Sequence, residues 1–165
     1  MTVHGGESAL TQEIQALVGK PWPDVMYEVD RTGIRAWARA VGYDDPVYYD
    51  ESVARERGFP RMPAPPGFLG VPRFRPGEPE PGPPIRGLHP QLQRSVNGGT
   101  ELEYHDTVYA GDELVATPVI IDVKERHGSL GQMLILTREV RFKRQSDLVA
   151  TLTATVINYR GDDGV

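Results

Sequence analysis

Cysteine is absent from this chain, and so are the segments that would place it in or across a membrane. Without cysteine there is no disulfide, thiolate nucleophile or zinc–cysteine site, and the composition fits a cytoplasmic protein. No apolar run approaches the ~20 residues that a membrane-spanning helix needs. Residues 1–6 lack the basic start and apolar core of a secretory signal. We therefore expect a cytoplasmic protein with no membrane association.

Basic clusters and metal-ligand spacings are also lacking. The formal net charge is −5, and lysine and arginine are scattered along the chain. Because a phosphate backbone attracts basic surfaces, we expect no nucleic-acid partner. No two of the four histidines have ligand spacing, so we expect no metal site and no other bound cofactor.

The first half of the chain predicts short helices around one strand. A strand is expected at residues 25–29, and further helices at residues 10–18 and 51–57. Asp30 can cap a helix that runs to Val41 and ends at Gly42. The apolar residues of that helix fall on one side, which predicts their burial: Ile34, Trp37, Ala38 and Val41.

Proline and glycine crowd residues 60–90. Each proline removes an N–H donor and fixes φ, so a long regular element is not expected there. Residues 67–71 have room for a helical turn. Residues 72–98 are predicted to form an extended flap, and the C-terminal tail is expected to be short and flexible.

The last third predicts long antiparallel strands. Apolar and polar residues alternate over about residues 101–108, 115–123, 134–143 and 148–156, with turns between them. We expect a meander in which each strand pairs with the next, and Pro118 suggests a bulge or an edge position. The whole chain therefore predicts a single α+β domain.

Four segments in the same order resemble the MaoC-like hydratase/dehydratase family, and more narrowly its FAS1-type dehydratase domain, the N-terminal half. They are the turn Asp45-Pro46-Val47-Tyr48, the Ala64-Pro65-Pro66 segment, the strand start Glu101-Leu102-Glu103-Tyr104-His105, and the turn Ala110-Gly111-Asp112. The resemblance covers about residues 20–160. It implies a hot-dog fold, in which a long curved antiparallel sheet wraps around a central helix.

Active members of that family carry Asp-x-Asn-Pro-x-His at the turn and use the aspartate and histidine to hydrate an enoyl thioester. Aligned on Pro46, these two positions are Tyr43 and Tyr48 here, and the asparagine position is Asp45. A tyrosine with a pKa near ~10 is a poor general base at neutral pH. The acid/base pair is therefore missing, and whether this chain is an enzyme stays open.

Three other residues are catalytic candidates. Asp44 or Asp45 could replace the missing aspartate if the turn is shifted, whereas Asp45 could instead cap a short helical turn that starts at Pro46. His89 could swing from the flap toward a substrate, but no carboxylate nearby would orient it. His105 is interpreted as a half-exposed strand histidine with a satisfied hydrogen bond.

The substrate-binding candidates lie in several segments. The rings of Tyr43 and Tyr48 could line an acyl tunnel or pack under the turn, and the resemblance adds Pro65, Phe68 and Leu69. Asn97 and Gly98 could offer backbone donors or form a hinge. The last candidates could meet the phosphates of coenzyme A: Arg94, with Arg73, Arg75 and Arg86.

The leading hypothesis is a subunit that binds acyl-CoA or another acyl thioester but lacks the acid/base pair. By the resemblance, a second hot-dog subunit would carry the catalytic aspartate and histidine, in a heterodimer or heterotetramer. The second hypothesis is an active homodimeric (R)-specific enoyl-CoA hydratase/dehydratase with non-standard residues. The third is a non-enzymatic acyl-binding module.

Overall fold

The computed structural model describes residues 8–73, 76–77 and 88–160, and its framework is one six-stranded sheet. The strand order is β2-β1-β4-β5-β6-β3, and every neighbouring pair is antiparallel. The strands are β1 (Val25–Glu28), β2 (Val71–Pro72), β3 (Arg94–Tyr104), β4 (Glu113–Gly128), β5 (Gly131–Arg144) and β6 (Asp147–Tyr159).

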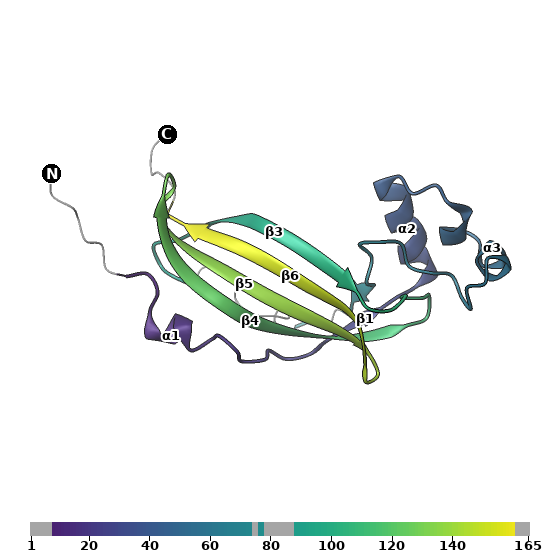
Figure 1. Cartoon of the computed structure of the whole chain (residues 1–165), viewed down its shortest axis with the longest axis horizontal. Coiled ribbons are helices and arrows are strands. Elements are labelled where there is room, and N and C mark those ends of the chain that lie inside the picture. The colour runs from purple at the N-terminus through teal and green to yellow at the C-terminus, as the bar shows by residue number, and fades with distance from the viewer. Residues whose placement is uncertain (1–7, 74–75, 78–87, 161–165) are drawn as a thin grey trace.

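The four long strands form a strongly curved sheet (Figure 1). Register shifts interrupt the pairing at three places, at Asn97/Gly99, Ile120/Asp122 and Phe142/Lys143. Such bulges bend a strand and increase its twist. The predicted hot-dog fold, a curled antiparallel sheet with few helices, is confirmed. At Pro118, β4 forms a continuous ladder only with β5. On the other side of β4, isolated bridges join the next two residues, Val119 and Ile120, to Pro21 and Val18.

The predicted meander is wrong in its first step, because β3 pairs with β6 and not with β4. After β3, residues 105–112 carry the chain across the end of the sheet. On the way, Ala64 donates to the Val108 carbonyl, Ala110 donates to that of Met62, and Gly111 donates to that of Val29. β4 then pairs with β1 on one side and β5 on the other.

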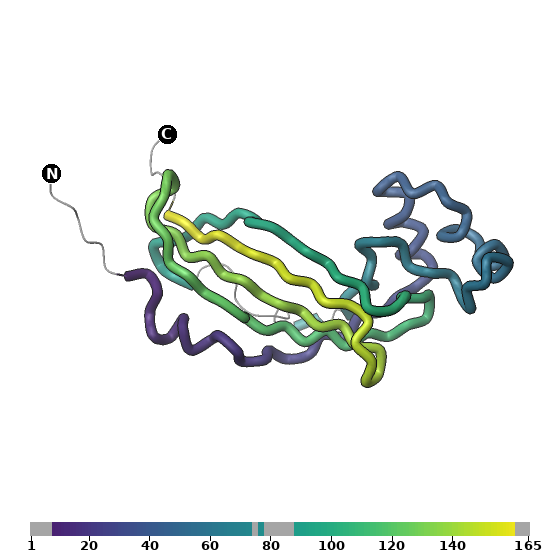
Figure 2. The backbone as a smooth tube through the Cα atoms, in the orientation of Figure 1, coloured from purple at the N-terminus to yellow at the C-terminus, as the bar shows by residue number. Residues whose placement is uncertain are grey.

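The helices are short and lie near the two ends of the sheet: α1 (Gln12–Gln15), α2 (Arg31–Val41), the 3₁₀ turn η1 (Pro46–Tyr48) and α3 (Glu51–Glu56). Figure 1 shows α2 and α3 together beyond one end, and Figure 2 shows the N-terminal segment running beside β4 from the other end. The predicted caps of α2 are confirmed. Asp30 accepts from the N–H groups of Thr32 and Gly33, and Gly42 ends the helix at φ 79°.

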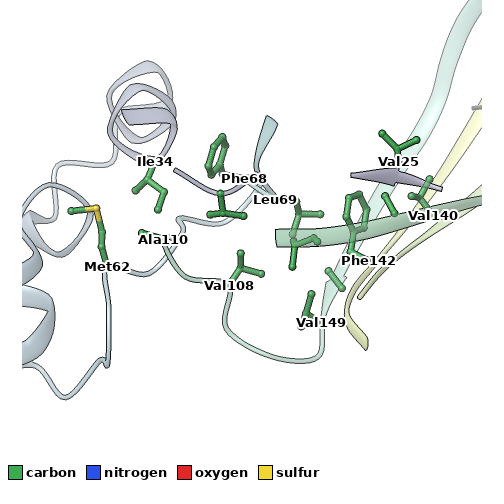
Figure 3. Packing of buried hydrophobic residues seen from close by; sticks show 14 residues of the cluster. Val25, Ile34, Met62, Phe68, Leu69, Val108, Ala110, Val140, Phe142 and Val149 are labelled. Carbon is green, nitrogen blue, oxygen red and sulfur yellow. The ribbon is translucent and has the colours of Figure 1, made fainter. Parts of the chain in front are cut away.

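The hydrophobic core has two clusters. The first joins α2 to the sheet through Ile34, Met62, Phe68, Val108 and Phe142 (Figure 3). The second lies near α1 and contains Ala9, Ile14, Leu92, Ile120, Val123, Leu134 and Leu136.

Only two of the four apolar residues predicted to be buried on α2 are buried. Ile34 and Ala38 are fully buried, whereas Trp37 is 38% exposed and Val41 is 47% exposed. The helix is beyond the end of the sheet, so only one side of the stripe faces the core. Trp37 instead contacts the next loop, where its ring packs near Phe68 and its Nε1–H donates to the Pro66 carbonyl.

The helical turn considered for residues 67–71 does not form. The Phe68 N–H donates to the Pro65 carbonyl in a single turn, and β2 follows. Between α3 and β3 the described residues contain no helix, so the central helix implied by the resemblance is not among them. Residues 74–75 and 78–87 of the expected flap, like the tail at residues 161–165, lie outside the described residues. The last part of the flap is not loop, because residues 94–98 belong to β3.

Candidate functional site

The turn between α2 and α3 is fixed by local hydrogen bonds. The Tyr43 N–H donates to the Ala38 carbonyl at 2.8 Å, which turns the chain back over the end of α2. The Tyr49 hydroxyl donates to the Tyr43 carbonyl at 2.6 Å. Arg35 then donates from α2 to the Tyr49 carbonyl at 3.1 Å. The turn from Tyr43 to Tyr49 is therefore held firmly against α2.

Tyr43 and Tyr48 pack together in this turn. Their ring centroids are 6.1 Å apart, within the range of favourable aromatic contacts. Burial raises the pKa of Tyr48 above its ordinary value, and the negative charge of Asp45 adds to the rise. The Tyr48 phenol therefore keeps its proton at neutral pH, and in the described part of the chain its hydroxyl makes no hydrogen bond.

Asp45 has a structural task in the same turn. Its carboxylate accepts from the Val47 N–H at 3.0 Å, which caps η1, and pairs with Arg57 at 2.7 and 2.8 Å. The Val47 N–H, followed by Arg57, lowers the pKa of Asp45. The cap interpretation is therefore the one that the geometry supports. Asp44 is exposed beside it.

The turn described above forms one wall of a groove, and the end of β3 forms the second wall. The Tyr104 hydroxyl accepts from the Gly67 N–H at 2.8 Å, and burial raises the pKa of Tyr104. The next residue, His105, lies 3.0 Å through Nε2 from the Thr151 hydroxyl on β6. Its Nδ1 is 3.9 Å from the Glu103 carboxylate, too far for a hydrogen bond. Tyr104 and His105 are thereby held in fixed positions.

The two walls enclose an open groove of about 640 Å³. This volume is within the range of small-molecule sites. Its polar lining comes from Asp45, Tyr48, Arg57, Tyr104, His105 and Asp106, and its apolar lining includes Val47, Phe59, Pro63, Ala64, Pro66 and Val108. A concave groove that combines apolar surface with convergent polar groups is an arrangement expected of a ligand site.

A buried ion-pair cluster holds the second wall in place. Asp112 is only 5% exposed and accepts from Arg61 at 2.7 Å, from Arg144 at 3.0 Å and from the Tyr109 N–H at 2.9 Å. Arg144 also donates to the Thr107 carbonyl at 2.6 Å and pairs with Asp106. The Gly-Asp turn of the sequence therefore supports the groove from behind and does not line it.

Three predicted binding residues lie in the core and not in the groove lining. Pro65 is fully buried, and Phe68 and Leu69 are 6% and 7% exposed in the first cluster. Their neighbours Ala64 and Pro66 line the groove instead. The segment borders the groove, but its larger side chains turn inward because they join α2 to the sheet.

The other candidates lie along β3 or before it. Arg94 begins the strand and Tyr104 ends it, which separates them by about 30 Å at ~3.3 Å per residue. His89 accepts from the Gln91 N–H, and the adjacent Leu88 packs on the second cluster. The structure therefore brings neither His89 nor Arg94 to the turn.

Asn97 and Gly98 form a bulge in β3, and their binding role stays a prediction. Gly98 has no partner across the β3–β6 pairing, and the Gly99 N–H donates to the Asn97 side chain. Arg73 pairs with Glu28 and Glu113. Arg75 and Arg86 lie outside the described residues.

Sequence reasoning missed Tyr104 and Arg57 as groove residues and did not place His105 beside Tyr48. Both walls come together only because residues 105–112 cross the end of the sheet. No local pattern contains that information. Within residues 8–73, 76–77 and 88–160, no three His, Asp or Glu side chains gather as metal ligands, and no helix is long and apolar enough to cross a membrane.

Comparison with protein families gives a match over most of the chain. The model of the FAS1-like, dehydratase domain region matches residues 16–152. A UPF0336 protein of Streptomyces coelicolor is 34% identical over 143 residues, which are 86% of this chain and 93% of the relative. A UPF0336 protein of Mycobacterium tuberculosis is 30% identical over 147 residues, 87% of each chain.

Solved structures share the fold at lower identity. A chain of the ChsH1–ChsH2 complex of M. tuberculosis superposes with a TM-score of 0.76 at 20% identity, covering 93% of this chain and all of that one. A chain of the M. tuberculosis HadBC complex, a (3R)-hydroxyacyl-ACP dehydratase, gives 0.64 at 24% identity, over 86% and 96% of the two chains. Both of these neighbours are subunits of complexes between two different chains.

Proposed function

The chain belongs to the family of FAS1-like dehydratase domain regions, and from this premise we propose that it is the acyl-thioester-binding, non-catalytic subunit of a hydratase or dehydratase assembly. A second hot-dog subunit supplies the aspartate and histidine. The substrate is an acyl-CoA or a similar acyl thioester. The subunit shapes the binding groove and does not move the proton.

One observation carries the proposal, namely the packed pair of phenols at the acid/base positions. Tyr43 and Tyr48 contact each other, and the pKa of Tyr48 is raised, away from the neutral range that a general base needs. The carboxylate of this turn that lines the groove is Asp45, which is engaged by Arg57 and the Val47 N–H. The turn therefore keeps the family's shape without its proton-transfer pair.

The two edges of the sheet differ, and the difference favours binding of a second subunit at β3. The opposite edge, β2, has two residues, one of them Pro72 without an N–H, and Arg73 beside it is paired with two glutamates. By contrast, β3 has eleven residues and, in the described part of the chain, pairs only with β6. Its outer row of N–H and C=O groups suits a partner strand.

The test compares the lone chain with a complex. Purified alone, the chain is expected to hydrate crotonyl-CoA at least ~100-fold more slowly than an assembly with an acid/base pair. Co-expressed with a hot-dog protein that bears Asp-x-Asn-Pro-x-His, it is expected to co-purify and to raise turnover or change chain-length preference. Full activity of the lone chain would refute the proposal, and ligand binding without turnover in any complex would favour a non-enzymatic module.

A matched pair of variants tests the edge. Val96, on β3, is 42% exposed and Val71, on β2, is 50% exposed. Because a lysine on an edge strand opposes pairing, Val96→Lys is expected to reduce co-purification at least ~10-fold, whereas Val71→Lys leaves it unchanged. Equal loss in both variants would contradict an interface at β3.

A second candidate function, an active enzyme, is favoured by one observation. His105 lines the same groove as Tyr48 and is oriented by Thr151, so an imidazole is available to a ligand there. This candidate predicts hydration by the lone chain and its loss in His105→Gln. The leading proposal predicts no activity in either protein.

A further inference from the structure

Two tyrosines from distant parts of the chain line the groove, and their hydroxyl groups favour one kind of ligand atom, a hydrogen-bond acceptor. Tyr48 comes from the turn after α2, and Tyr104 comes from the end of β3. Both line the 640 Å³ groove, and the Tyr43 phenol is close enough to influence the pKa of each. Tyr48 and Tyr104 therefore face the same groove from its two walls.

The position of the Tyr104 oxygen is fixed by the loop in front of it. Gly67 donates its N–H to that oxygen at 2.8 Å. The loop cannot drift, because Trp37 Nε1–H donates to the Pro66 carbonyl at 3.2 Å and the Trp37 ring lies 3.0 Å from where a Gly67 Cβ would be. A phenol that accepts from an amide still has its own proton to give. Accepting that bond polarises the O–H and makes it a better donor.

Unlike the Tyr104 hydroxyl, the Tyr48 hydroxyl accepts no hydrogen bond from the described residues, but it too can donate one to a ligand. Its ring is held by Tyr43 and by partial burial, and among the described residues its O–H has no acceptor. Both phenols stay protonated at neutral pH because burial raises the pKa of each. The charged groups of the lining are already engaged, Arg57 with Asp45 and Asp106 with Arg144. The two phenols are neutral donors beside them, which suits an acceptor oxygen without a full charge.

We infer that the Tyr48 and Tyr104 hydroxyls bind the carbonyl oxygen of an acyl thioester in the groove. This inference rests on the proposed function and adds to it the atoms that recognise the ligand. Active family members have a histidine, a proton-transfer group, at the position of Tyr48. This chain then has a hydrogen-bond donor there instead. The subunit orients the carbonyl without reacting with it.

Two ligands that differ by one oxygen test the inference. Butyryl-CoA is a thioester, and S-butyl-CoA is the thioether without the carbonyl. Calorimetric titration of the full chain, in whichever assembly it purifies, is expected to give about tenfold tighter binding of butyryl-CoA. Tyr48→Phe and Tyr104→Phe remove only an oxygen and should each reduce this preference about threefold, and the double variant should abolish it.

The controls separate the possible failures. Tyr109→Phe changes a tyrosine whose ring lies over Arg61 and not in the groove, so it should keep the tenfold preference. S-butyl-CoA should bind all variants within about twofold of the natural chain, and thermal unfolding should show that each is folded. Equal binding of both ligands, or a preference that survives in the double variant, would overturn the phenol pair while leaving the proposed function intact. Failure to bind either ligand would overturn both.

Discussion

The two ends of the curved sheet are closed by different means. At the end near α2, the first core cluster is surrounded by ion pairs and caps, including Asp112 with Arg61 and Arg144, and an open groove remains. At the end near α1, the second cluster buries Leu134 and Leu136 fully beside a single helical turn, with the buried Asn158 opposite Leu134 on β6. Among the described residues, the groove thus lies at the end held by ion pairs and caps, whereas the end near α1 is held mainly by side-chain packing.

This difference separates the roles of the candidate residues. Tyr48, Tyr104 and His105 line the groove at the end near α2, whereas His89 and Arg94 lie toward the end near α1. If the comparison is correct, damage to either end should cost stability, but only damage near α2 should alter the groove.

The largest expected effect comes from core truncation at each end. Ile34 and Leu134 are both fully buried, one in each cluster. Ile34→Ala and Leu134→Ala are each expected to lower the free energy of unfolding by about 3–4 kcal/mol in urea titrations. Only Ile34→Ala should also weaken butyryl-CoA binding, because its cluster includes Val108 of the groove wall. Equal effects of the two variants on binding would break the comparison.

The next effect tests the polar support of the groove. Asp112→Ala leaves two arginines and the Tyr109 N–H without their buried carboxylate. The free energy of unfolding should fall by about 3 kcal/mol, and not by more, because both arginines still reach solvent. The matched control is Asp122→Ala, which removes an exposed carboxylate paired with Lys124 and should cost under ~1 kcal/mol. Similar losses in both variants would show that Asp112 does not support the wall.

A pair of glycines separates steric contact from backbone strain. Gly70 has φ 95°, and a Cβ there would lie 2.7 Å from the Glu28 carbonyl oxygen. Gly58 has φ 86° with nothing within 4 Å. Gly58→Ala should cost about 1 kcal/mol from the left-handed conformation alone, and Gly70→Ala about 2 kcal/mol or more. Thermal unfolding measures both, and equal costs would mean that β1 yields to the added methyl group.

The smallest expected effect is a pH dependence near α1. Hydrogen bonds from Gln132 and Ser8 lower the pKa of Glu125 to about 2. A lowered pKa stabilises the folded chain above the unfolded value near ~4.3, and this contribution is lost as pH falls toward 2. Because the carboxylate is partly exposed and solvent screens it, the loss should be under ~1 kcal/mol. Urea midpoints at pH 6 and 3 should fall less for Glu125→Gln than for the natural chain, and equal falls would contradict the assignment.

Features written in short segments were predictable from the sequence. Asp30, Gly42 and Asp45 act on backbone groups within a few residues, so their caps follow from local chemistry. The alternation in the last third likewise predicts its strands, because a half-buried strand repeats every two residues. These elements and the family resemblance together gave the hot-dog fold.

Features that depend on distant pairing were not predictable. Nothing within residues 94–104 indicates that this strand pairs with β6 and not with β4. The groove depends on that choice, since it brings Tyr104 and His105 to the turn at Tyr48. Trp37 has the spacing of a buried residue, yet it is 38% exposed because α2 extends past the end of the sheet.

The bulge at Gly98 has a consequence for which chains can associate with this one. A flat strand from an unrelated protein would meet a local bend halfway along β3 and lose its register there. Only a partner whose own edge curves at the matching point can follow the strand along its length. A single inserted glycine thus makes this long edge strand a poor template for indiscriminate aggregation.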